Sequence, residues 1–121
     1  MPIILRLKPS DIHGIGVFTD HLIPKKTDIH NLLFEKNDYK FWWASETDNR
    51  TIKLLQRYGI KEGKLGYHGP TYLNRMSVGW FLNHSDNPNA SHLDKKWRYC
   101  ALRDIKPGEE ITIDYQTLKS N

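Results

Sequence analysis

The apolar segments of this 121-residue chain are all short, and turn-forming residues flank them. IILRL near the start runs into Pro9, WFL runs into NHSDNPN, and Pro107-Gly108 precedes the apolar residues of ITIDY. Short runs separated by Gly, Pro and Asn favour short strands over long helices. The sequence therefore predicts a mainly β fold made of several short sheets.

The positions of the apolar and turn-forming residues predict where these strands lie. They are expected at residues 3–7, 17–18 and 29–34, and again within WRYCAL and ITIDY. Residues 38–58 carry apolar side chains at near-helical spacing and predict a small helical insert, interrupted near Asp48-Asn49. The four glycines of GIKEGKLGYHGP predict a loop or hairpin, and SVGWFL predicts a short helix or turn. No repeat or linker divides the sequence, so residues 1–121 are expected to form a single domain.

Composition narrows the possible partners. Eighteen Lys and Arg against fourteen Asp and Glu give a net charge of +4, and the basic residues are spread along the chain. Nucleic-acid-binding proteins usually gather such residues on one face, so direct nucleic-acid binding is not favoured.

The single cysteine, Cys100, excludes an internal disulfide and a cysteine-based zinc cluster. No apolar run approaches the ~20 residues of a membrane helix, and the N-terminus lacks a signal sequence. A soluble, intracellular protein without a membrane partner is expected.

Two stretches suggest chemistry without proving it. HGIGVF places two glycines before a strand, where glycine serves either a positive φ or the close approach of another group. It lacks the third glycine and the helix of a dinucleotide-binding motif, and a tight hairpin or bulge remains an alternative. Tyr115 ends ITIDY. Its hydroxyl could orient a substrate amine, or the residue could be a half-buried structural tyrosine.

The cluster in WFLNHSDNPNA raises the question of a metal site. His84, Asp86 and His92 are the residue types of a two-histidine, one-carboxylate iron centre. The Asn-Pro-Asn between them indicates a turn, and His92 is too near in sequence for the usual third ligand. No metal is therefore expected. The stretch is either a plain turn or a pocket built from backbone.

Taken in order, HGIGVF, WFLNHSDNPNA and ALRDIKPGEEITIDY resemble the three motif blocks of the SET domain family, and they bracket nearly the whole chain. The resemblance implies an enzyme that transfers a methyl group from S-adenosylmethionine to a protein lysine. It also implies a fold in which the last segment threads beneath a preceding loop in a knot-like arrangement. That threading would bring the Asn83–His84 turn against residues 111–115.

The resemblance further implies roles for individual residues. The methionine part of the cofactor would be bordered, largely by backbone, by His13, Gly14, Ile15 and Gly16. The side chain of Asn83 and the main chain of His84 would meet the rest of the cofactor, with His84 at the adenine edge. Tyr115 would be the catalytic tyrosine, beside both the methyl group and the target nitrogen. A second channel tyrosine is common in the family, and Tyr67 and Tyr72 are the candidates.

The sequence departs from the family pattern in three places. Trp80-Phe81 stands where Arg-Phe is usual, and Asp86 stands where cysteine often follows Asn-His-Ser. After Tyr115 only QTLKSN follows, without the cysteine cluster that closes the lysine channel in many relatives. The target lysine would then be covered by the helical insert with its aromatic residues 41–43, by a second subunit in a homodimer, or by the substrate's own partner.

The expected partner is a protein that presents a lysine, such as a histone or a histone-like basic protein. The compartment would be the cytoplasm, or the nucleus if the source is eukaryotic or viral. No general base is apparent, so solvent is expected to take the proton from the lysine. Two alternatives stay open: an inert SET-fold module that binds a basic peptide or S-adenosylmethionine, and a small basic nucleic-acid binder.

Overall fold

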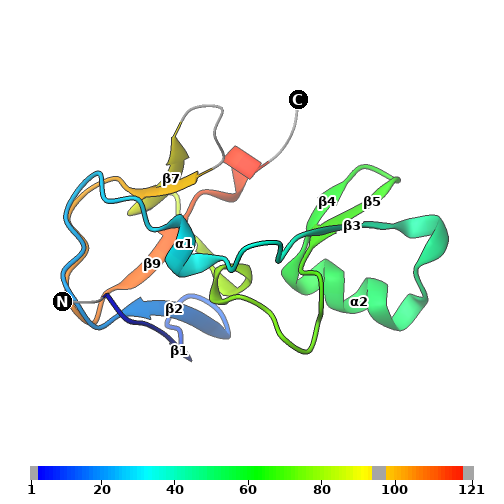
Figure 1. Ribbon diagram of the computed structural model, residues 1–121, viewed down its shortest axis with the longest axis horizontal. Helices are drawn as coiled ribbons and strands as arrows, with labels where there is room; N and C mark the ends of the chain where they lie inside the picture. Colours follow the sequence, from blue (N-terminus) through cyan, green and yellow to red (C-terminus); the bar gives the residue numbers. More distant parts are fainter. Residues whose placement is uncertain (1–2, 94–97, 119–121) are drawn as a thin grey trace.

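Three small sheets form the framework of this computed structural model, which describes residues 3–93 and 98–118. The largest has the strand order β1-β2-β9-β6, from β1 (Leu5–Pro9), β2 (Ile15–Thr19), β9 (Glu110–Ile113) and β6 (Asn83–His84). The second has the order β3-β5-β4, from β3 (Lys40–Trp43), β5 (Gly66–Gly69) and β4 (Ile60–Glu62). The third pairs β7 (Ala90–Leu93) with β8 (Arg98–Ala101). The expectation of a mainly β fold of short sheets is confirmed (Figure 1).

Strand β9 lies between β2 and β6, far from both in sequence. It runs antiparallel to β2 and parallel to β6, with Asn83 opposite Thr112 and His84 opposite Ile113. The predicted meeting of the Asn83–His84 turn with the C-terminal strand is thus confirmed, while the knot-like threading stays a prediction. Because β6 has only two residues, Asn89 extends the pairing. Its side chain accepts from Thr112 N at 2.9 Å and donates to the Glu110 carbonyl at 2.7 Å.

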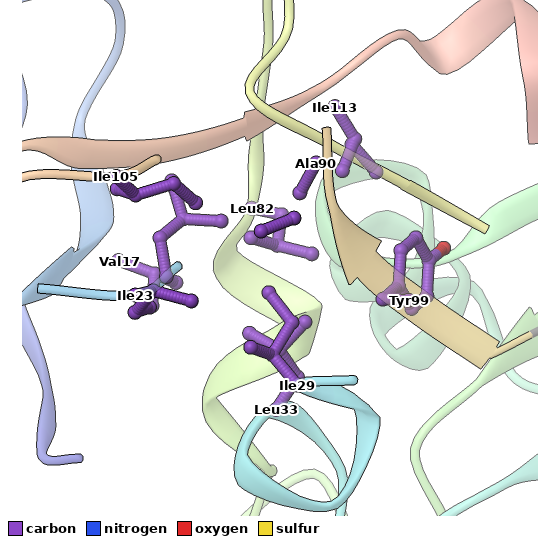
Figure 2. Packing of buried hydrophobic residues seen from close by; sticks show 11 residues of the cluster. Val17, Ile23, Ile29, Leu33, Leu82, Ala90, Tyr99, Ile105 and Ile113 are labelled. Atoms are coloured by element: carbon purple, nitrogen blue, oxygen red, sulfur yellow. The ribbon is translucent and has the colours of Figure 1, made fainter. Parts of the chain in front are cut away.

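The main core lies between this sheet, the β7–β8 pair and helix α1 (His30–Leu33). Figure 2 shows Leu33 of α1 and Ile29, the residue before this helix, pointing toward Leu82. The predicted strand at residues 29–34 is wrong. Ile29 and Leu33 are both buried and lie four residues apart, so one helical turn directs both into the core. The Asp28 carboxylate accepts from the His30 backbone N–H at 2.9 Å at the start of this turn.

The insert also differs from its prediction. Helix α2 spans only Asn49–Tyr58, and the Asp48 side chain caps its N-terminus by accepting from Thr51 N. The expected interruption is therefore the beginning of the helix. The aromatic residues 41–43 lie on β3, not on a helix, because pairing with β5 and the alternation of side chains place them on both faces of a sheet. The predicted hairpin in GIKEGKLGYHGP is confirmed as β4 and β5.

Helix α2 packs on one face of the β3-β5-β4 sheet, where Leu55 is fully buried. In Figure 1 this helix and its sheet lie to one side of the part built from β1, β2 and β9. The connection back runs through the 3-10 helix η2 (Val78–Phe81), which confirms the short helix predicted in SVGWFL. None of the helices within residues 3–93 and 98–118 is long and apolar enough to cross a membrane.

Asp38 ties the start of the insert to the chain that follows it. Its carboxylate accepts from the backbone N–H groups of Ser77 at 2.7 Å and Thr71 at 2.9 Å. Burial alone would raise the pKa of Asp38, but these hydrogen bonds outweigh burial and hold the pKa below its ordinary value. A lowered folded-state pKa means that the carboxylate stabilises the fold above the unfolded pKa of about 3.9, and that this contribution is lost as the pH falls through the folded value.

We therefore expect Asp38→Asn to lower the free energy of unfolding by about 1–2 kcal/mol at pH 7, because a charged acceptor is lost. The difference from the wild type should shrink as the pH falls below about 4, because the unfolded carboxylate is then protonated and the folded one loses its charge as the pH passes its lowered pKa. Urea unfolding at pH 7 and pH 3 measures both values. A difference of the same size at the two pH values would contradict the assignment.

Candidate active site

The two glycines of HGIGVF serve different purposes. Gly14 has a φ of +47°, which a residue with a side chain rarely adopts, and its carbonyl accepts from Ser10 N at 2.8 Å to close a tight turn. Gly16 is needed for close approach, since a Cβ there would lie 2.2 Å from Oε2 of Glu110. The approaching group is thus the protein's own carboxylate.

Asn83 joins this turn to the sheet. Its Nδ2 donates to the carbonyl oxygens of His13 at 3.0 Å and Ile15 at 3.2 Å, and to Oε2 of Glu110 at 2.8 Å. The residue is only 6% exposed. Within the part of the chain that the structure describes, its Oδ1 takes no hydrogen bond. An acceptor is therefore held beside the turn without a protein partner.

Tyr115 does not end a strand as predicted; β9 stops at Ile113, and Tyr115 opens the 3-10 helix η4 (Tyr115–Leu118). Its hydroxyl donates to the Leu82 carbonyl at 2.5 Å. Burial raises the pKa of Tyr115, and the Glu110 carboxylate raises it further, so the hydroxyl stays protonated at neutral pH. Because its proton points at Leu82, the lone pairs of the oxygen remain available to accept a hydrogen bond.

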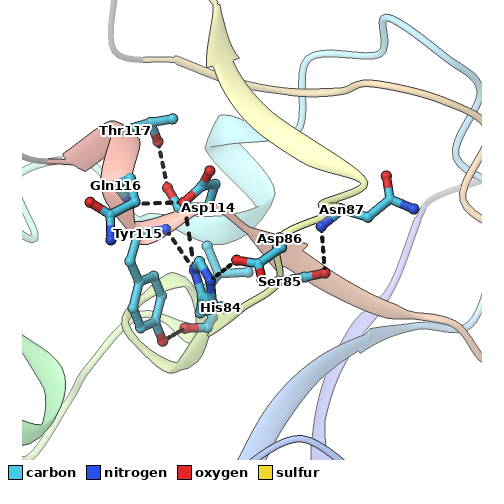
Figure 3. Close-up of polar contacts among 9 residues, drawn as sticks. His84, Ser85, Asp86, Asn87, Asp114, Tyr115, Gln116 and Thr117 are labelled. Atoms are coloured by element: carbon cyan, nitrogen blue, oxygen red, sulfur yellow. Dashed lines mark hydrogen bonds and ion pairs between the residues drawn. The ribbon is translucent and has the colours of Figure 1, made fainter.

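The His84 side chain fixes the backbone of Tyr115, as Figure 3 shows. The backbone N–H of Tyr115 donates to Nδ1 of His84 at 3.0 Å, so Nε2 carries the ring proton and donates to Asp86 at 2.8 Å. Sequence reasoning had assigned a role only to the main chain of His84. The Asp86 side chain is 99% exposed, and an exposed contact of this kind contributes little to stability.

His84, Asp86 and His92, the residue types of an iron centre, do not gather around one point. His84 contacts Asp86, whereas Nε2 of His92 lies 3.0 Å from the Thr117 carbonyl oxygen. Among residues 3–93 and 98–118, no group of three or more His, Cys, Asp or Glu side chains is placed to hold a metal ion.

Two cavities share Tyr115 as a lining residue. The first, of about 120 Å³, lies between the glycine turn, β6 and the end of α2. The second, of about 320 Å³, extends toward Phe34, Tyr99 and Leu118. The walls of both are shared by Arg57, Tyr58, Trp80, Leu82 and Tyr115. Five residues therefore contribute to both cavities, and Tyr115 is one of them.

Most of the predicted cofactor residues come together here. The first cavity is lined by His13, Gly14, Ile15, Asn83 and Tyr115. Gly16 and His84 do not line it; Gly16 lies against Glu110, and His84 contacts Tyr115.

The structure places the two candidate channel tyrosines elsewhere. Tyr67 is buried in β5, and Tyr72 is 58% exposed beneath the Arg75 guanidinium. Neither lines the two cavities, whereas Tyr58 and Tyr99 line the second. Sequence reasoning missed Arg57 and Tyr58 because their approach to Tyr115 depends on how the insert packs, which no local pattern reveals.

Comparison with known proteins agrees with this geometry. The SET domain family matches residues 14–116, or 103 of 121 residues. A histone-lysine N-methyltransferase of Debaryomyces hansenii, H3 lysine-36 specific, is 29% identical over an alignment of 113 residues, and this alignment covers 88% of this chain and 15% of that protein. One of Schizosaccharomyces pombe, H3 lysine-37 specific, is 28% identical over an alignment of 118 residues, and this alignment covers 92% of this chain and 72% of that protein.

A solved structure has the same fold. It is that of a Plasmodium falciparum protein described as a histone methyltransferase, and it aligns with a TM-score of 0.61 at 24% identity over 95% of each chain. The ordered motif blocks, the glycine turn held by Asn83 and the pairing of β6 with β9 coincide with a family match that covers most of the sequence. The chain belongs to the SET domain family.

Proposed function

We propose that this chain is a protein-lysine N-methyltransferase that uses S-adenosylmethionine. The observation that carries the proposal is the position of Tyr115, which lines both cavities. A methyl donor and a lysine amine must come together at one point, and two cavities that share Tyr115 and four other lining residues suit that requirement. Use of S-adenosylmethionine is general among SET methyltransferases, and the two yeast relatives are named histone-lysine N-methyltransferases.

The residues of the first cavity fit the polar groups of this cofactor. Oδ1 of Asn83, which takes no hydrogen bond from the described residues, would accept from the ammonium of its amino-acid part, and the Arg57 guanidinium would pair with its carboxylate. When bound, S-adenosylmethionine would supply a methyl group carried on a sulfonium sulfur. A neutral amine can attack this methyl carbon, and the carbon–sulfur bond then breaks to leave a thioether. The backbone of residues 13–15 would border the same end of the molecule.

The second cavity fits the lysine side chain. Its walls include Phe34, Trp80 and Tyr99, which would remove water from the ammonium and lower its pKa. The Tyr115 oxygen, whose own proton points at Leu82, would accept an N–H of the amine and direct its lone pair toward the first cavity. Holding the reacting atoms about 3–3.5 Å apart and in line supplies several kcal/mol of the barrier reduction. The proposed substrate is a basic protein such as a histone.

The test has two steps on the same preparation. Calorimetry with S-adenosylmethionine measures binding, and mass spectrometry then records added methyl groups on a panel of lysine-rich proteins that includes histone H3. We expect both binding and a methylated product. Binding without product on any panel member would favour the inert module. Absence of binding would overturn the proposal.

Asn83→Ala is expected to weaken S-adenosylmethionine binding by about 100-fold or more, since it removes the acceptor and frees the glycine turn. Calorimetry on the folded variant measures the loss, with thermal unfolding to check that the variant is folded. Asn87→Ala, an exposed asparagine of the same loop, is the matched control and should bind like the wild type. Similar affinities for the two variants would show that Asn83 does not contact the cofactor.

A further inference from the structure

The Glu110 carboxylate connects three segments that surround the first cavity. It extends from β9 past Gly16, where the missing side chain leaves room for it. Its Oε2 accepts from Nδ2 of Asn83 at 2.8 Å, and its Oε1 accepts from the Ser10 hydroxyl at 2.7 Å. Glu110 is not among the residues that line the cavity, so its influence on a ligand would pass through its two partners.

The Ser10 hydroxyl requires this carboxylate. Its oxygen already accepts from the backbone N–H groups of Ile12 at 2.9 Å and His13 at 3.3 Å. A hydroxyl has one proton and two lone pairs, so the proton is the one group left to pair, and it points at Glu110. The turn that carries His13 and Gly14 is thereby anchored to the C-terminal strand.

The Asn83 amide also requires the Glu110 carboxylate. An amide nitrogen carries two hydrogens, and three acceptors surround it: the carbonyls of His13 and Ile15, and Oε2 of Glu110. A flipped amide would set Oδ1 against these three oxygens, so the orientation is fixed. Donation to a carboxylate also polarises the amide and makes Oδ1 a stronger acceptor.

We infer that Glu110 is a positioning residue of the cofactor site, which presents Oδ1 of Asn83 to a ligand ammonium and holds the Ser10–Gly14 turn in place. The choice of the ammonium of S-adenosylmethionine as that ligand group rests on the proposed function. The orientation of the amide does not, because it follows from the hydrogen bonds of the free protein.

Glu110→Gln tests the inference, since it keeps the side-chain shape but must turn an N–H toward Asn83 or Ser10. Two ligands are compared by calorimetry: S-adenosylhomocysteine, which has the ammonium, and methylthioadenosine, which lacks the amino-acid part. We expect the affinity for the first to fall about 10-fold or more and that for the second to change less than about twofold. Glu109→Gln is the matched control. This adjacent carboxylate pairs with Arg103 at 2.7 Å, and its variant should bind both ligands like the wild type.

A second measurement needs no ligand. The side-chain amide protons of Asn83, followed by nitrogen-15 NMR, should shift and exchange faster with solvent in Glu110→Gln but not in Glu109→Gln. Unchanged amide resonances, or an equal loss of affinity for both ligands, would overturn the inference. If the wild type binds neither ligand, the proposed function fails, and the amide resonances still decide the role of Glu110. Should Glu110→Gln not fold, Ser10→Ala replaces it, with the same selective loss expected at smaller size.

Discussion

Tyr115→Phe is expected to lower the rate of methyl transfer about 100-fold while the affinity for S-adenosylmethionine changes less than about twofold. The variant loses the oxygen that would accept a hydrogen bond from the amine, as well as the bond from the hydroxyl to the Leu82 carbonyl. Phenylalanine keeps the ring that lines both cavities, so the cofactor should still fit. Single-turnover kinetics with a methylated-product readout and calorimetry give the two quantities separately.

Tyr72→Phe is the control for this experiment. Tyr72 is an exposed tyrosine outside both cavities, and it was also a candidate for the lysine channel, so an unchanged rate would remove it from the site. A fall in cofactor affinity that matches the fall in rate would show that Tyr115 serves binding alone. If the rate holds and only the number of methyl groups on the product changes, the hydroxyl limits the space for the amine instead of orienting it.

Asn89→Ala is expected to lower the free energy of unfolding by about 2–5 kcal/mol. The residue is 1% exposed, and its truncation leaves the buried Thr112 N–H and the part-buried Glu110 carbonyl without this partner. Each unpaired buried group costs roughly 1–3 kcal/mol, which accounts for the size of the effect. Urea unfolding measures it. Asn87→Ala, on the exposed part of the same loop, should change stability by less than about 0.5 kcal/mol. A comparable loss in both variants would contradict the bridging role of Asn89.

Local patterns predicted the elements that a few neighbouring residues determine. The alternation in ITIDY and the turn at Pro107-Gly108 gave β9 nearly correctly, although the strand ends two residues earlier. Helix α1 was predicted as a strand because one turn is too short for the spacing of Ile29 and Leu33 to show a helical period. Residues 41–43 were assigned to a helix because three consecutive aromatic residues carry no period of their own. Their pairing with β5 decides the structure.

The residues of the site also divide into those that local motifs predict and those that only the packing of distant segments brings in. Gly14, Asn83 and Tyr115 were named because they lie within motif blocks, and all three line the first cavity. The role of Glu110 was not predicted, and the residue was noted only as part of a Gly-Glu-Glu turn. Its partner Ser10 lies 100 residues away in the sequence, so no local pattern links the two. The lining by Arg57 and Tyr58 depends on the packing of α2, which the sequence pattern does not describe.

The position of β9 between β2 and β6 has a consequence for the order of assembly. The glycine turn lies near one end of the chain, and Glu110 and Tyr115 lie near the other, so the first cavity cannot exist until the two ends have met. Contacts over such long sequence separations form slowly. A ligand that bridges Asn83 and Tyr115 would also hold the last strand in place, because binding to the folded state alone shifts the folding equilibrium toward it. The first cavity would then gain its affinity for such a ligand only once β9 has joined the sheet, and the ligand would in turn stabilise the folded state.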